Sequence, residues 1–144
     1  MPDVPGPEVL RPVDLSTFGP SFARYFDVRF CHGQAMFSGA SEALMGAWIR
    51  PAAPEPLDAA LRVALLDVMP PAIFTTLVRP RSLATVAMTV HLLAPQVRLA
   101  DDAFVFSTTR ASAQTEGYST QEDLLWSRDG ELLGRGLQMV AVIR

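Results

Sequence analysis

The stretch Leu-Asp-Ala-Ala-Leu-Arg-Val-Ala-Leu-Leu-Asp-Val, residues 57–68, decides the fold. It is rich in leucine and alanine, which favour helix, and Pro56 before it suits the first turn of a helix. One apolar stripe consists of Leu57, Ala60, Leu61, Ala64, Leu65 and Val68. Val63 and Leu66 lie on the other side, so we predict a helix over 57–68 that protein covers on most of its faces.

The ends of this helix are also predictable. Pro70 and Pro71 should end it, because the residue before a proline avoids helical geometry. Asp58 and Arg62 are four residues apart, and we expect them to form an ion pair on the edge of the helix that reaches water.

The segments around the helix alternate between apolar and polar residues, which is typical of strands. We predict strands over residues 22–30, 42–50, 85–93, 104–113, 117–126 and 132–143. A turn is expected at His32 and Gly33, and Ser-Arg-Asp-Gly at 127–130 is a strong hairpin signal between the last two strands. In the strand over 85–93, we expect Thr85, Ala87, Thr89 and His91 to share one face.

Two strands, one long apolar helix and a run of antiparallel strands favour an α+β fold in which one sheet wraps the helix. This arrangement is a single hotdog fold, and we assign it to residues 22–144. Five prolines fall within residues 1–21, so this segment is expected to be an extended N-terminal arm.

Composition excludes several kinds of chemistry. All 12 basic residues are arginine, so lysine Schiff bases and the P-loop are excluded. A net charge of −3 argues against nucleic acid as a partner. The single Cys31 cannot form an internal disulfide, and two histidines without a carboxylate cluster give no reason to expect a metal. We expect neither a signal peptide nor a membrane span, and therefore a cytoplasmic protein. Lysine and asparagine, whose codons begin with AA, are both absent, so we expect a GC-rich genome, and we expect a bacterial source.

Asp67 is the first candidate for chemistry. It lies in the last turn of the helix among apolar residues, where the helix dipole and poor hydration both raise the pKa of a carboxyl group. It could act as a base or bind water, or it could simply accept a backbone N–H at a solvated helix end.

Gln138 is the second candidate, because a primary amide within a strand needs hydrogen-bond partners. It shares a face with Gly134 and Gly136, which could leave a groove for a thin ligand, or could mark a bulge beside an ordinary cross-strand amide bond. Thr85 could be functional or an ordinary strand threonine, with Thr89 as its alternative. His91 is a weaker candidate for substrate binding.

Several segments together resemble the C-terminal hotdog domain of the acyl-CoA thioesterase II (TesB-like) family. They are Trp48 to Pro51, the helix end Ala64 to Ala72, the strand Ala84 to His91, the segment Leu125 to Leu132 and the ending Leu137 to Arg144. In that family an Asp at the helix end, a Thr or Ser on the next strand and a Gln on the last strand bind the hydrolytic water. The resemblance assigns these roles to Asp67, Thr85 and Gln138.

The resemblance implies an acyl-CoA thioesterase that needs no cofactor and releases free acid and CoA. Members of this family typically carry two hotdog domains in one chain, so we expect this chain to form a homodimer that pairs sheets edge to edge. The alternatives are a non-catalytic acyl-CoA-binding module, or a partner subunit for a separate N-terminal hotdog half. A hotdog hydratase is disfavoured because its Asp/His pattern is missing.

Overall fold

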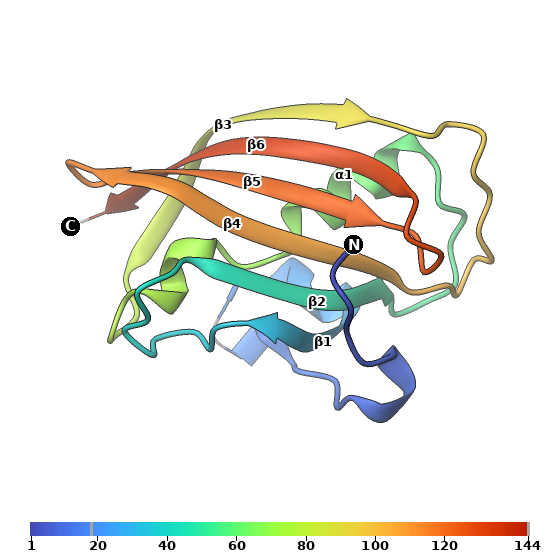
Figure 1. Cartoon of the computed structure of the whole chain (residues 1–144), viewed down its shortest axis with the longest axis horizontal. Coiled ribbons are helices and arrows are strands. Elements are labelled where there is room, and N and C mark those ends of the chain that lie inside the picture. Colours follow the sequence, from blue (N-terminus) through green and yellow to red (C-terminus); the bar gives the residue numbers. More distant parts are fainter. Residues whose placement is uncertain (18, 144) are drawn as a thin grey trace.

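The chain forms one antiparallel sheet with a single α-helix against one face, seen in a computed structural model that describes residues 1–17 and 19–143 (Figure 1). The elements are β1 (Phe26–Gly33), β2 (Leu44–Pro51), α1 (Ala59–Asp67), β3 (Ser82–Leu92), β4 (Val105–Thr115), β5 (Tyr118–Trp126) and β6 (Leu132–Ile143). The six strands lie in the order β1-β2-β4-β5-β6-β3. The predicted α+β class and hotdog fold are therefore confirmed. Arg144, the last residue of the expected domain, lies outside the described residues.

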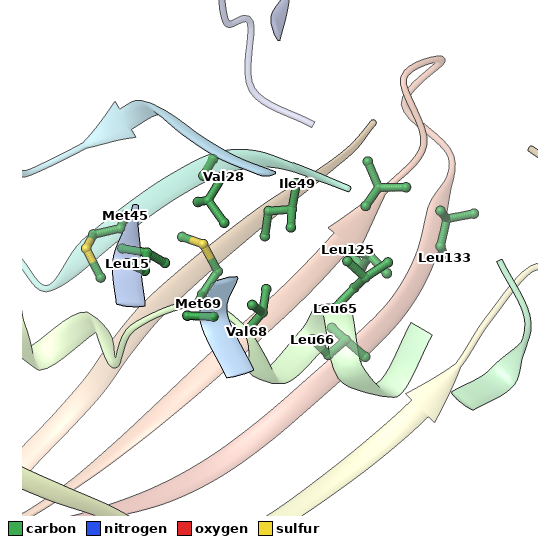
Figure 2. Packing of buried hydrophobic residues seen from close by; sticks show 13 residues of the cluster. Leu15, Val28, Met45, Ile49, Leu65, Leu66, Val68, Met69, Leu125 and Leu133 are labelled. Atoms are coloured by element: carbon green, nitrogen blue, oxygen red, sulfur yellow. The ribbon is translucent and has the colours of Figure 1, made fainter. Parts of the chain in front are cut away.

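The core lies between α1 and the inner face of the sheet. Figure 2 shows Leu65 and Leu66 of α1 beside Leu125 of β5 and Leu133 of β6, and all four side chains are buried. A Cβ on Gly134 would lie 3.0 Å from Cδ1 of Leu66, so the glycine lets the helix approach the sheet closely. This close approach holds α1 over β5, β6 and β3, on the side of the sheet that ends at the edge strand β3.

The helix differs from its prediction in length and in exposure. It runs over Ala59–Asp67, and Asp58 caps it by accepting a hydrogen bond from the backbone N–H of Leu61 at 2.8 Å. Ala60, Val63 and Ala64 remain exposed, so protein in this chain covers only part of the helix.

The prediction of an ion pair between Asp58 and Arg62 is wrong. Arg62 is only 4% exposed, and its guanidinium donates to the backbone carbonyls of Leu93, Ala94 and Val97 at 2.7 to 3.2 Å. The guanidinium lies against the loop after β3, which offers it three carbonyl acceptors. Arg62 therefore fastens that loop to the helix.

The N-terminal segment is packed onto the domain. The indole N–H of Trp48 donates to the carbonyl of Pro5 at 2.8 Å, and the N–H of Val13 donates to the carbonyl of Val28 at 2.8 Å. Leu15 belongs to the buried core. The strand predicted from residue 22 begins only at Phe26, because Ser21–Tyr25 form a 3-10 helix after Pro20.

The other predicted strands agree with the structure to within a few residues. The hairpin between β5 and β6 is confirmed, with Gly130 at φ 85° and the Ser127 hydroxyl accepting from the N–H of Glu131 at 3.1 Å. Among the described residues, no helix has the length and apolar character needed to cross a membrane.

We predict that Arg62→Ala lowers the free energy of unfolding by about 2 to 4 kcal/mol, because it removes a charged donor and leaves three carbonyls without it. Urea unfolding measures this loss. Arg79→Ala, at an exposed arginine in the loop before β3, is the matched control and should change stability by less than about 0.5 kcal/mol. Equal stability of the two variants would contradict the assigned role of Arg62.

Candidate active site

Asp67, Thr85 and Gln138 come together where α1 ends over the sheet. The Thr85 hydroxyl donates to Oε1 of Gln138 at 3.1 Å, and Nε2 of Gln138 donates to Oδ1 of Asp67 at 3.2 Å. Thr85 lies on β3, Gln138 on β6 and Asp67 at the end of α1. One amide thus joins a hydroxyl and a carboxylate from three separate elements.

The same three side chains line a cavity of about 300 Å³. Its other walls are largely apolar and come from the N-terminal segment and the chain after α1, including Leu15, Phe22, Ala23, Met69, Phe74 and Leu83. Gln138 is only 5% exposed, whereas Asp67 and Thr85 both remain exposed. The cavity therefore joins a polar end, open to solvent, to apolar walls.

Thr89 and His91 do not share the face of Thr85, so that expectation is wrong. The pairing of β3 with β6 shifts register between Thr85 and Ala87, which leaves Val86 as an extra residue. A one-residue bulge reverses which face the following side chains occupy. Thr89 and His91 consequently stand exposed on the outer face and are not part of the candidate site.

Gly134 and Gly136 lie on the inner face with Gln138, but they form no groove for a ligand. A Cβ on Gly136 would lie 3.3 Å from Cβ of Asp123 and 3.3 Å from Cε of Met88, and Leu66 fills the space over Gly134. Protein side chains occupy the room that the glycines leave. The groove considered for these glycines is thus filled by close packing.

Asp123 on β5 belongs to this cluster and was missed in the sequence. Its side chain is completely buried, and its Oδ2 accepts from Nε2 of Gln138 at 3.1 Å. Nε2 of Gln121 donates to Oδ1 of Asp123 at 3.1 Å, and Oε1 of Gln121 accepts from the N–H of Ala72 at 3.1 Å. The cluster therefore contains two carboxylates and two amides.

A signal for these residues was present in the sequence. Ser119, Gln121, Asp123 and Leu125 alternate along β5, and Leu125 marks their shared face as the core face. The intervening residues of β5 include Thr120 and Glu122, so both faces of this strand carry polar residues. For that reason the alternation along β5 did not by itself predict that Asp123 points inward.

Burial shapes the acidity of both carboxyl groups. Asp67 is exposed on one side only, and partial desolvation by its neighbours raises its pKa, although the hydrogen bond from Gln138 opposes the rise. Burial raises the pKa of Asp123 to about 6, against the opposing effect of the hydrogen bonds that this carboxylate accepts. A raised pKa makes a carboxylate a better proton acceptor, as catalysis by a general base requires.

The described part of the chain contains no group of three or more His, Cys, Asp or Glu side chains that could hold a metal ion. The chemistry available at the cluster consists of carboxylates, amides and a hydroxyl. These groups can bind a water molecule and accept its proton.

A family model described as the acyl-CoA thioesterase C-terminal domain matches residues 2–142. A conserved protein of unknown function with a hotdog fold from Alicyclobacillus acidocaldarius is 30% identical, with a TM-score of 0.88 over 100% of this chain and 55% of the other. The acyl-CoA thioesterase II TesB2 of Mycobacterium marinum is 17% identical, with a TM-score of 0.68 over 99% of this chain and 55% of the other.

This chain thus spans about half the length of those two solved structures. The Escherichia coli PaaI protein from the phenylacetic acid degradation operon is 8% identical, with a TM-score of 0.65 over 90% of this chain and 88% of that one. It shares the fold within a chain of similar length. No curated protein sequence gave a significant match.

The raised pKa of Asp123 predicts how stability depends on pH. Between its usual pKa of 3.8 and about 6 the folded state holds the proton more tightly, so the free energy of unfolding falls as pH rises. From pH 4 to pH 8 the wild type should lose up to about 3 kcal/mol more than Asp123→Asn, which cannot titrate there. Urea unfolding across this range measures the difference.

Asp102→Asn, at an exposed aspartate, serves as the control and should follow the wild type. Identical pH dependence in the wild type and Asp123→Asn would show that the Asp123 carboxyl titrates normally and would contradict the prediction.

Proposed function

This chain belongs to the acyl-CoA thioesterase C-terminal domain family, and we propose that it hydrolyses an acyl-CoA thioester to the free acid and CoA. The observation that carries the proposal is the hydrogen-bonded cluster of Asp67, Gln138 and Thr85 on the wall of a single cavity. A carboxylate, an amide and a hydroxyl are sufficient to hold and deprotonate one water molecule.

In the proposed reaction, Gln138 and Thr85 hold a water molecule beside Asp67. Oδ1 of Asp67 accepts from Gln138, which leaves Oδ2 to accept the proton of the water. The hydroxide attacks the thioester carbonyl and the C–S bond breaks. The CoA sulfur takes up the proton that Asp67 removed from the water, so CoA leaves as the thiol and Asp67 is again a carboxylate. Because the water attacks directly, no covalent intermediate with the protein forms.

The apolar walls of the cavity suit an acyl group, while its polar end suits the thioester. Leu15, Phe22 and Met69 lie on these walls and would contact the acyl chain. Burying apolar surface contributes about 25 cal/mol per Å², so the acyl group would supply much of the binding free energy.

We also propose that the active form is a homodimer. β3 is an edge strand of the sheet, and Thr85 on this strand and Asp67 at the end of α1 are both exposed. Val86 on β3 and Val63 on α1 are exposed apolar residues. A second copy that pairs along β3 would cover the open end of the cavity and the unpaired edge.

A second candidate is a subunit that completes its site with a separate N-terminal hotdog half. The observation in its favour is that the chain spans about half the length of the double-length structures it matches. In that case the covering surface is a different chain, and the isolated protein binds acyl-CoA without hydrolysing it.

Asp67→Asn is expected to lower kcat by about 10²-fold or more, because asparagine cannot accept the proton of the water. The assay is release of free thiol from short, long and aryl acyl-CoAs, with Asp102→Asn as the matched control. Retained hydrolysis in a folded Asp67→Asn protein would remove Asp67 from the reaction. Retained CoA binding without hydrolysis of any of these thioesters by the wild type would favour the non-catalytic candidate.

Sedimentation of the purified protein at micromolar concentration is expected to give twice the monomer mass of 15.7 kDa. A monomer at this concentration would contradict the homodimer. Activity that appears only after addition of a separate hotdog half would favour the second candidate.

A further inference from the structure

Asp123 is a buried carboxylate that the proposed reaction does not use. It is 0% exposed, and the described residues that line the cavity include Gln121 and Gln138 but not Asp123. It therefore cannot touch a substrate. Its contacts nevertheless reach the catalytic cluster directly.

The nitrogen end of the Gln138 amide is held between two carboxylates. Nε2 donates to Asp67 at 3.2 Å and to Asp123 at 3.1 Å. An ionised carboxylate only accepts hydrogen bonds, so this pair fixes which end of the amide carries the NH2 group. The carbonyl oxygen of Gln138 must then face Thr85, whose hydroxyl donates to it.

Asp123 is itself held by a second amide. Nε2 of Gln121 lies 3.1 and 3.4 Å from its two oxygens, and Oε1 of Gln121 accepts from the N–H of Ala72. Ala72 lies five residues after Asp67, the last residue of α1. The hydrogen bonds therefore close a ring through β5, β6 and the segment that carries Asp67.

Burying a carboxylate costs free energy, which only hydrogen bonds or a cationic partner can offset. The four salt bridges described for this structure leave Asp123 without a cationic partner. The other titratable group on the same amide is Asp67. The neighbours of Asp123 on β4 and β6 in the sheet pairing are Thr109 and Gly136, which do not titrate.

We propose that Asp123 is a positioning residue, which orients the Gln138 amide so that its carbonyl faces Thr85 and the hydrolytic water. The proposal rests on the function proposed above. Asp123 acts through Gln138 and takes no proton from the substrate or the water. Without its acceptor, one N–H of the amide is free and the amide can rotate away from Thr85.

The test in activity is Asp123→Asn, which keeps the shape of the side chain but places an NH2 group where one acceptor oxygen stood. We expect kcat to fall by about 10- to 100-fold with KM changed by less than about twofold, since misplacement of a catalytic group affects the reaction more than substrate binding. The matched control is Ser119→Ala, another buried polar residue on the inner face of β5, which should keep wild-type kcat. An unchanged kcat in folded Asp123→Asn, or a change in KM alone, overturns the proposal.

The second readout needs no substrate. The chain has no asparagine and five glutamines, so its NMR spectrum holds only five side-chain amide groups. In the wild type, the Gln138 amide protons should exchange with solvent at least about tenfold more slowly than those of exposed Gln114. Asp123→Asn should speed exchange at Gln138, whereas Ser119→Ala should leave it unchanged.

These readouts separate the two proposals. If the wild type hydrolyses no thioester, the proposed function fails, and amide exchange still decides whether Asp123 holds Gln138. If Asp123→Asn does not fold, the amide exchange rates of Gln138 and Gln114 in the wild type still test the role of Asp123. Exchange at Gln138 as fast as at Gln114 overturns that role.

Discussion

The site depends on the hydrogen bonds of the Gln138 amide, because they connect the end of α1 to side chains on two strands of the sheet. The amide nitrogen donates to Asp67 and Asp123, and the amide oxygen accepts from Thr85. The close approach of α1 to the sheet over Gly134 puts the end of the helix within reach of this amide. Core packing and the polar cluster thus support the same placement of Asp67.

A polar cluster in the interior of a small domain is costly, and here it lies beside apolar cavity walls. Burial raises the pKa of both carboxyl groups, and at Asp123 it reaches about 6. In the proposed reaction only Asp67 accepts a proton, whereas Asp123 holds the Gln138 amide. The raised pKa of Asp123 also lowers the free energy of unfolding as pH rises, so the arrangement that orients the site lowers stability.

Much of the fold could be predicted from the sequence, because the strand alternation and the apolar helix depend on local patterns. The sheet face that each side chain of β3 occupies after Thr85 could not be predicted, because the extra residue Val86 reverses the alternation and no turn residue marks the bulge. The partners of Arg62 were also hidden, because its three carbonyl acceptors lie more than 30 positions away along the chain. Asp67, Gln138 and Thr85 were candidates from their places on the helix and strands, and the resemblance assigned them one shared role, while Asp123 required the sheet register.

The central claim is that the thioester is bound and hydrolysed beside the Gln138 amide. The most direct measurement is a crystal structure with an acyl-CoA analogue in which a methylene group replaces the thioester sulfur. The account predicts that the ketone carbonyl lies in the cavity lined by Asp67, Thr85 and Gln138, with the acyl chain along Leu15 and Met69. An acyl group bound instead in the cavity of about 450 Å³ beside Leu57 and Arg98, near the start of α1, would contradict it.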